Sequence, residues 1–228
     1  MLRSLKIILS LCFIACSFAV WAIVIPASIE KETSEYIINV KYPEGFQDPR
    51  INAVVQHFID KTKNSFLQEL ASYTNVPAQA PGKSGLNITY SLPFQTKNVL
   101  SISFNISIYY RGAAHPSNTM AALNFIDGRQ VQLADLFRPE TDYLKPIADY
   151  SRKKLSEKKI SDQKWVAEGT KPTEKNYQIW SFAPTGIDII FDTYQVAAYV
   201  YGPQKIAIPL SQISPLLKPE ILHTVWGH

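Results

Sequence analysis

Between Asn98 and Tyr110, large apolar and small polar side chains alternate without a break. This period of two sends successive side chains to opposite faces of a strand. The apolar set would pack on a core while the polar set meets water, as in an antiparallel sheet. The alternative is a groove lined by the polar set. Its members are Ser101, Ser103, Asn105, Ser107 and Tyr109.

Other segments predict more strands and two main helices. Asp48-Pro49 combines an N-cap acid with a first-turn proline, and apolar residues follow at helical spacing to Ser72. A second helix is predicted over 142–159 and a short one over 162–168, ended by Gly169. Asp127-Gly128 predicts a hairpin. Further strands are expected over 35–42, 86–94, 117–126, 129–133, 177–182, 187–191 and 205–209.

Clustered strands with few helices indicate an α+β fold, with mostly antiparallel sheets and two closely packed halves. The expected division is an N-terminal half over 33–111 and a C-terminal half over 112–216. Residues 217–228 would form a helical or irregular tail. No internal repeat or low-complexity linker separates the halves.

Residues 1–27 are expected to be a signal peptide or an N-terminal membrane anchor. Arg3 and Lys6 precede an apolar run over 7–25, which is typical of export signals. Four outcomes stay open: cleavage after Ala22, cleavage after Ala27, an uncleaved anchor, or lipidation at Cys16. Each places the rest of the chain outside the cytoplasm, whether periplasmic, secreted or envelope-anchored.

Composition argues against several functional classes. Without Arg3 and Lys6 the remaining chain has 21 basic and 19 acidic residues, a near balance that gives no nucleic-acid footprint. Both cysteines, Cys12 and Cys16, lie in the apolar run, which leaves no disulfide framework or cysteine-based zinc site. The basic cluster over 152–159 is interpreted as the solvated face of a helix.

No catalytic motif stands out, and no cofactor or metal site is predicted. The four histidines do not pair at metal-ligand spacing. His115 lies in a loop framed by glycine, proline and tyrosines. It is either a general base or ligand contact, or a residue whose ring bonds a backbone carbonyl and locks the turn.

Asp188 and Asp192 could face the same side of a strand as a carboxylate pair for glycoside hydrolysis, although such acids also serve as solvent-facing residues or turn caps. The tyrosines around them are better candidates for ligand contacts, because tyrosine offers a rigid amphipathic surface. The candidate ligand-binding residues are therefore Tyr109, His115, Asp192, Tyr194, Tyr199 and Tyr201.

Two sets of motifs carry a family resemblance. They are Gly112-Ala113-Ala114-His115-Pro116 with Leu133-Ala134-Asp135-Leu136-Phe137, and Tyr194-Gln195-Val196-Ala197 with Tyr201-Gly202-Pro203. Together they resemble the domain of unknown function in the ectodomain of the RsiV anti-sigma factor. Residues 36–110 resemble the partner domain that accompanies it there and in PdaC-type peptidoglycan deacetylases. The match departs at Ala113, where the family has a second glycine.

The resemblance implies a binding role, because the RsiV ectodomain binds lysozyme. The first hypothesis is an extracytoplasmic binding module of the bacterial envelope that recognises lysozyme or peptidoglycan. The second is an envelope enzyme acting on cell-wall glycan through His115 with Asp188 or Asp192. The third is a structural envelope protein without a specific ligand. Membrane contact is expected only through the N-terminal segment.

Overall fold

The fold is taken from a computed structural model that describes residues 24–73 and 79–227. The expected signal or anchor segment, with its candidate lipidation site Cys16, lies outside these residues except for positions 24–27. Within the described ranges, no helix combines the length and apolar character needed to cross a bilayer.

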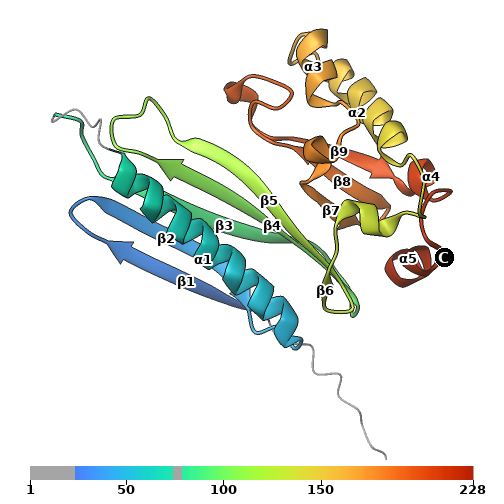
Figure 1. The fold of residues 1–228 in the computed structure, drawn as a ribbon, viewed down its shortest axis with the longest axis horizontal. Coiled ribbons are helices and arrows are strands. Elements are labelled where there is room, and N and C mark those ends of the chain that lie inside the picture. The colour runs from blue at the N-terminus through green and yellow to red at the C-terminus, as the bar shows by residue number, and fades with distance from the viewer. Residues whose placement is uncertain (1–23, 74–78, 228) are drawn as a thin grey trace, which may run out of the picture.

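Six strands form a large sheet in chain order (Figure 1). They are β1 (Ile25–Glu32), β2 (Tyr36–Glu44), β3 (Ser84–Gln95), β4 (Val99–Tyr109), β5 (Ser117–Ile126) and β6 (Arg129–Gln130). Only β2 and β3 pair in parallel, because helix α1 (Pro49–Ser72) carries the chain back along the sheet between them. The other pairs are antiparallel.

The C-terminal part forms a small antiparallel sheet with its own helices (Figure 1). Its strands are β7 (Trp180–Ala183), β8 (Gly186–Phe191) and β9 (Gln204–Pro209). Its helices are α2 (Leu144–Lys158), α3 (Gln163–Gly169), α4 (Leu210–Ile213) and α5 (Pro219–Trp226). Short 3-10 turns occur at η1 (Leu133–Leu136), η2 (Glu174–Tyr177) and η3 (Tyr199–Tyr201). The predicted α+β class, mostly antiparallel with two main helices, is confirmed.

Helix α1 begins where the Asp-Pro pair predicts. The Asp48 carboxylate accepts the Arg50 N–H at 2.9 Å and so satisfies one of the free donors of the first turn. Val55, Ile59 and Phe66 are fully buried against the apolar face of the large sheet. Burying each such side chain contributes about 1.5–3 kcal/mol.

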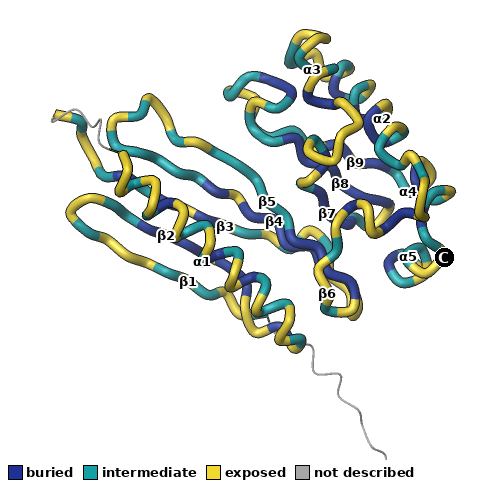
Figure 2. The backbone as a smooth tube through the Cα atoms, viewed as in Figure 1, coloured by how far each residue is buried: buried dark blue, intermediate teal, exposed yellow. Residues whose placement is uncertain are grey.

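The polar face of β4 does not simply meet water. Ser101 is fully buried, and its Oγ lies 2.6 Å from Asn124 Oδ1 and accepts the Phe182 N–H at 2.9 Å. Asn124 Nδ2 donates to the Trp180 carbonyl at 2.8 Å. Figure 2 shows the buried stretches of β4 and β5 beside β7. The expected solvated face is therefore wrong at Ser101 and Ser103, where the small sheet packs, although Asn105 is exposed.

Several boundaries differ from the predicted ones. β1 was not predicted, because its first residues continue the apolar N-terminal run. The strand expected over 177–182 begins only at Trp180, since Tyr177 ends a 3-10 turn with its hydroxyl bonded to the Thr170 carbonyl. Gly169 is the last helical residue of α3, and Thr170 is the cap. The strand expected over 129–133 stops at Gln130, where the chain turns into η1.

The large sheet reaches beyond the expected division of the chain. β5 and β6 extend it to Gln130, so the boundary at 111/112 falls inside this sheet. The tail over 217–228 contains α5, whose Trp226 indole N–H donates to the Ala183 carbonyl at 3.0 Å. The tail is thus part of the small half.

Strand register fixes which segments share an end of the large sheet. Ile25 pairs with Glu44, and Val99 pairs with Ile126, at one end. Tyr36 pairs with Ser84, and Ile108 with Ser117, at the other. The β4–β5 loop, defined here as Tyr110–Pro116, therefore lies at the opposite end of the sheet from the start of β1.

Candidate functional site: an aromatic cluster between the two halves

The candidate residues meet where two loops touch. One is the β4–β5 loop. The other, named here the elbow, is Asp192–Pro203, which joins β8 to β9 and contains η3. The His115 and Tyr199 rings lie 4.3 Å apart between centroids, and Tyr194 and Tyr199 lie 5.6 Å apart. These three rings form one contiguous aromatic cluster.

Hydrogen bonds fix the central ring of this cluster. Asn118 Nδ2 donates to the Tyr199 hydroxyl oxygen at 2.7 Å, and that hydroxyl donates to the Pro116 carbonyl at 3.0 Å. His115 Nδ1 lies 2.9 Å from the same carbonyl, so the Nδ1-protonated ring donates there. The interpretation that the His115 ring bonds a backbone carbonyl is confirmed, although its side chain is exposed.

Asp192 joins the elbow to the large sheet. Its Oδ1 accepts the Met120 N–H of β5 at 3.0 Å and the Thr193 N–H at 2.9 Å. Burial raises the pKa of this carboxyl, and the two backbone donors partly oppose that rise. A carboxylate that accepts two backbone N–H groups is used as a structural acceptor, so Asp192 positions the cluster.

The start of the elbow, around Gln195, is hydrogen-bonded to α3 and η2. Gln195 Nε2 donates to the Gly169 and Asn176 carbonyls at 3.1 and 3.0 Å, and Gln195 Oε1 accepts the Asp192 N–H at 3.0 Å. The Trp165 indole N–H donates to the Tyr194 carbonyl at 3.0 Å. These contacts hold Tyr194 at a φ of 67°, a conformation that non-glycine residues rarely adopt.

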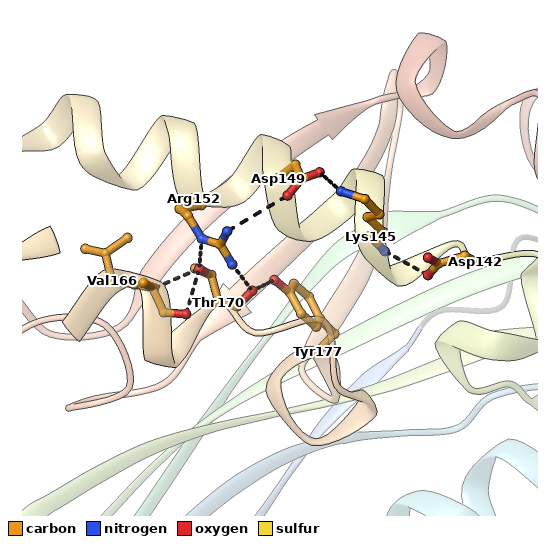
Figure 3. A network of polar contacts seen from close by, with 8 residues as sticks. Asp142, Lys145, Asp149, Arg152, Val166, Thr170 and Tyr177 are labelled. Atoms are coloured by element: carbon orange, nitrogen blue, oxygen red, sulfur yellow. Dashed lines mark hydrogen bonds and ion pairs between the residues drawn. The ribbon is translucent and has the colours of Figure 1, made fainter. Parts of the chain in front are cut away.

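A partly buried network of hydrogen bonds joins α2 to the end of α3 and to η2, next to the elbow (Figure 3). At its centre, the Thr170 carbonyl accepts the Tyr177 hydroxyl at 2.9 Å and Arg152 Nη2 at 3.4 Å. Arg152 Nε donates to Thr170 Oγ1 at 3.0 Å, and that hydroxyl donates to the Val166 carbonyl at 2.7 Å. Arg152, which the sequence assigned to a solvated basic face, therefore links α2 to the end of α3.

The outer side of the elbow is exposed. Tyr194, Val200 and Tyr201 expose 52%, 82% and 48% of their surface, and they are three of the five exposed large apolar residues in the described ranges. Scattered apolar residues on a surface are ordinary, but these three stand on one loop. The elbow therefore exposes two tyrosines and a valine on a loop that hydrogen bonds hold in place.

The candidates do not all join the cluster. Tyr109 accepts the Gly112 N–H at 3.4 Å and supports the β4–β5 loop, and Tyr201 stands on η3 with its ring exposed. Sequence reasoning missed Asn118, Trp165 and Gln195, which orient the cluster. The one available signal was the Tyr-Gln pair at 194–195 in the elbow motif, but its partners lie 19 and 26 residues away.

The arrangement does not assemble a catalytic pair. Asp188 forms an ion pair with Lys205 of β9 at 3.0 Å, whereas Asp192 bonds backbone amides. Among residues 24–73 and 79–227, no hydrogen bond or ion pair joins His115 to a carboxylate. In those same ranges, His, Cys, Asp and Glu side chains do not gather in a group that could hold a metal ion.

Comparison with known proteins identifies two domain families. Residues 29–118 match the family model described as "Deacetylase PdaC", and residues 134–211 match "Protein of unknown function (DUF3298)". The chain is therefore similar to both families, each over one part of its length. His115 lies in the PdaC match and Tyr199 in the DUF3298 match, so both families contribute to the aromatic cluster.

A curated protein is similar to most of the chain. The chain is 28% identical over 195 residues to the peptidoglycan-N-acetylmuramic acid deacetylase PdaC of Bacillus subtilis (strain 168), which covers 84% of this chain. It spans 40% of that relative's length.

Two solved DUF3298 proteins share the fold. The protein from Pseudomonas aeruginosa PAO1 superposes with a TM-score of 0.64 at 12% identity, and the one from Bacteroides fragilis NCTC 9343 with 0.56 at 18%. Each comparison covers 87% of this chain and 96% of the other.

Proposed function

We propose that this chain is an extracytoplasmic binding module of the bacterial envelope that recognises peptidoglycan or lysozyme. The name of the Bacillus relative, a peptidoglycan deacetylase, supports a cell-wall context. The apolar run after Arg3 and Lys6 supports export. The resemblance of the C-terminal motifs to the RsiV ectodomain supports the lysozyme arm of the proposal.

The observation that carries the proposal is the exposed aromatic surface of the elbow. Tyr194 and Tyr201 are about half exposed, yet the loop that bears them is held by Asp192 and Gln195. A loop already fixed in its bound form loses little conformational entropy on binding. Aromatic side chains on such a loop are the usual centre of binding energy.

A retention assay tests this function. The purified module is applied to insoluble peptidoglycan and, separately, to immobilised lysozyme. We expect retention on at least one, and a loss of about tenfold or more in affinity for the double variant Tyr194→Ala/Tyr201→Ala, since one central aromatic anchor contributes about 2 kcal/mol or more.

The matched control is Tyr90→Ala. Tyr90 is a half-buried tyrosine of β3 that packs on the α1 side of the large sheet, away from the elbow. This variant should retain the wild-type affinity. Retention of wild-type protein on neither material would overturn the proposed function, and so would equal losses in the control and the double variant.

A further inference from the structure

A cavity of about 620 Å³ lies at the end of the large sheet where β1 begins. Its walls are the start of α1 with the residues before it, the β3–β4 hairpin and the β5–β6 turn, which meet at that end (Figure 1). The lining is mostly apolar and includes Val24, Phe46, Ile51, Val99, Leu100 and Phe125. A cavity of roughly 300–1,000 Å³ with apolar walls and a few polar groups is the usual form of a small-ligand site.

Hydrogen bonds hold the three walls of this cavity together. Arg50 Nη2 donates to the Asp127 carbonyl at 2.7 Å, which joins the start of α1 to the β5–β6 turn. The Asp127 N–H donates to the Asn98 carbonyl at 2.7 Å, which joins that turn to the β3–β4 hairpin. A Cβ at Gly128 would lie 1.7 Å from Asp48 Oδ2, so the turn packs directly on the helix start. Because the walls are fixed in advance, a ligand would order little of the protein on binding.

The cavity lies where the chain leaves its apolar N-terminal run. Val24 lines the cavity, and the run over 7–25 ends one residue after it. The run is long enough to cross a bilayer. With the run as a membrane anchor, the cavity lies beside the bilayer, where acyl chains are the abundant apolar ligands. Its position and its apolar lining therefore favour an acyl chain as the occupant.

The rim of the cavity carries a lysine that is free to bind an anion. The two acids on the rim, Asp48 and Asp127, face Arg50 instead: the hydrogen bond from Asp48 raises the pKa of Arg50, and the charge of Asp127 adds to that rise. Lys97 is exposed, and its ammonium forms no hydrogen bond or ion pair with the rest of residues 24–73 and 79–227. A lysine binds phosphate as a point charge. The rim therefore favours a phosphate-bearing, anionic head group.

We propose that this cavity binds one acyl chain of an anionic membrane phospholipid, with the lipid phosphate beside Lys97. The proposal is independent of the proposed function, because the β4–β5 loop and the elbow cluster that contacts it lie at the other end of the large sheet. It gives an anchored chain a second attachment to the bilayer. An anchor alone leaves the module free to tilt, whereas a lipid held in the cavity keeps this end of the sheet at the membrane surface.

Photo-cross-linking of the full chain in vesicles tests the proposal. The probe is phosphatidylglycerol with a photoreactive group at the end of one acyl chain, and mass spectrometry maps the labelled peptides. We expect label on the cavity walls as well as on residues 7–23. The same probe made as phosphatidylcholine should label the walls about fivefold less, which corresponds to about 1 kcal/mol for one lysine at an anionic lipid surface. Lys97→Gln should remove this preference, and Lys61→Gln, at an exposed site on α1, should keep it.

Bulky substitutions test whether the label enters the cavity itself. Ile51→Trp fills the cavity from the first turn of α1 and should lower wall labelling several-fold. Leu70→Trp is the matched control, since Leu70 is half-buried like Ile51 but lies in the last turn of the same helix, away from the cavity. Gln95→Trp places the same bulk on the exposed rim. It should also lower wall labelling, and it keeps the test valid if Ile51→Trp does not fold.

Three results would overturn the lipid site. They are label confined to residues 7–23, wall labelling that neither Ile51→Trp nor Gln95→Trp lowers, and an equal loss of labelling in Leu70→Trp. Equal wall labelling by the two lipid probes would overturn the anionic head group. Retention on peptidoglycan or lysozyme separates this proposal from the proposed function, because Ile51→Trp and Gln95→Trp should be retained like wild type.

Discussion

At the scale of single residues, Asp192 was selected from the sequence as a candidate site residue, but its contact with the large sheet was not predicted. Its sequence context suggested one half of a carboxylate pair, yet its oxygen accepts the N–H of Met120, 72 residues earlier. His115 was placed correctly in a turn, because glycine and proline around it are local signals. Long-range partners leave no such local trace, so the position of Asp192 was predictable and its contact was not.

The raised pKa of Asp192 makes stability depend on pH in a defined direction. Below the ordinary aspartate value of 3.8, folded and unfolded chains both hold the proton. As pH rises above it, the unfolded chain ionises first while the folded chain keeps its proton, so the free energy of unfolding falls. The fall ends once pH has passed the folded-state pKa.

Asp192→Asn removes this titration and keeps an oxygen acceptor for Met120. We expect the stability of wild type relative to the variant to be greatest below pH 3.8, to fall as pH rises through the folded-state pKa of Asp192, and then to level off. Urea unfolding at a series of pH values measures the difference. Glu30→Gln, at an exposed site on β1, controls for loss of a charge. A difference that rises with pH would contradict the assigned effect of burial.

At the scale of elements, local signals were sufficient where capping and periodicity agreed. Helix α1 follows the Asp-Pro start and an apolar stripe, and β5 runs over 117–126 as predicted, up to the Asp127-Gly128 turn. β1 was not predicted, because its first residue is also the last residue of the apolar run that was assigned to an export signal or anchor. The late start of β7 could not be read locally, because the preceding turn is held by Tyr177 and Thr170.

The packing of the elbow against the end of α3 is predicted to require glycine at position 169. A Cβ at Gly169 would lie 2.1 Å from the Gln195 carbonyl oxygen and 2.7 Å from Val196 Cγ1. Gly169→Ala should therefore lower the free energy of unfolding by about 1–3 kcal/mol through overpacking, although alanine is the better helix former. It should also weaken retention on the ligand that the wild-type elbow binds.

Gly85→Ala is the matched control, since a Cβ there meets its nearest neighbour, the Ile37 carbonyl oxygen, at an ordinary 3.7 Å. Chemical denaturation of both variants measures the effect. Equal stability of the two would show that the elbow yields to the new side chain and is not held as tightly as its contacts indicate.

At the scale of the whole molecule, the two halves are joined by buried polar groups as well as by apolar packing. Close packing of the halves was expected because no linker separates them, but the surface through which they pack was not. Small polar residues alternating along β4 look alike in sequence whether they face water or a second sheet. Here Ser101 and Asn124 face β7.

Asn124→Ala tests how strongly this junction couples the halves. The substitution leaves the Trp180 carbonyl without its buried donor, which costs about 1–3 kcal/mol. Calorimetry should show a lower melting temperature, and Ser107→Ala, on the same face but only half-buried, should change it little. A melting temperature that the Asn124 substitution leaves unchanged would mean that apolar packing alone joins the halves.

The placement of the β1 start and the β4–β5 loop at opposite ends of the large sheet has a mechanical consequence. If the chain is tethered through its N-terminus while a ligand is held at the loop, tension runs along the strands. The backbone hydrogen bonds of an antiparallel ladder lie across that direction. The hydrogen bonds of the eight residue pairs between β1 and β2 are then loaded together in shear, instead of breaking one pair at a time.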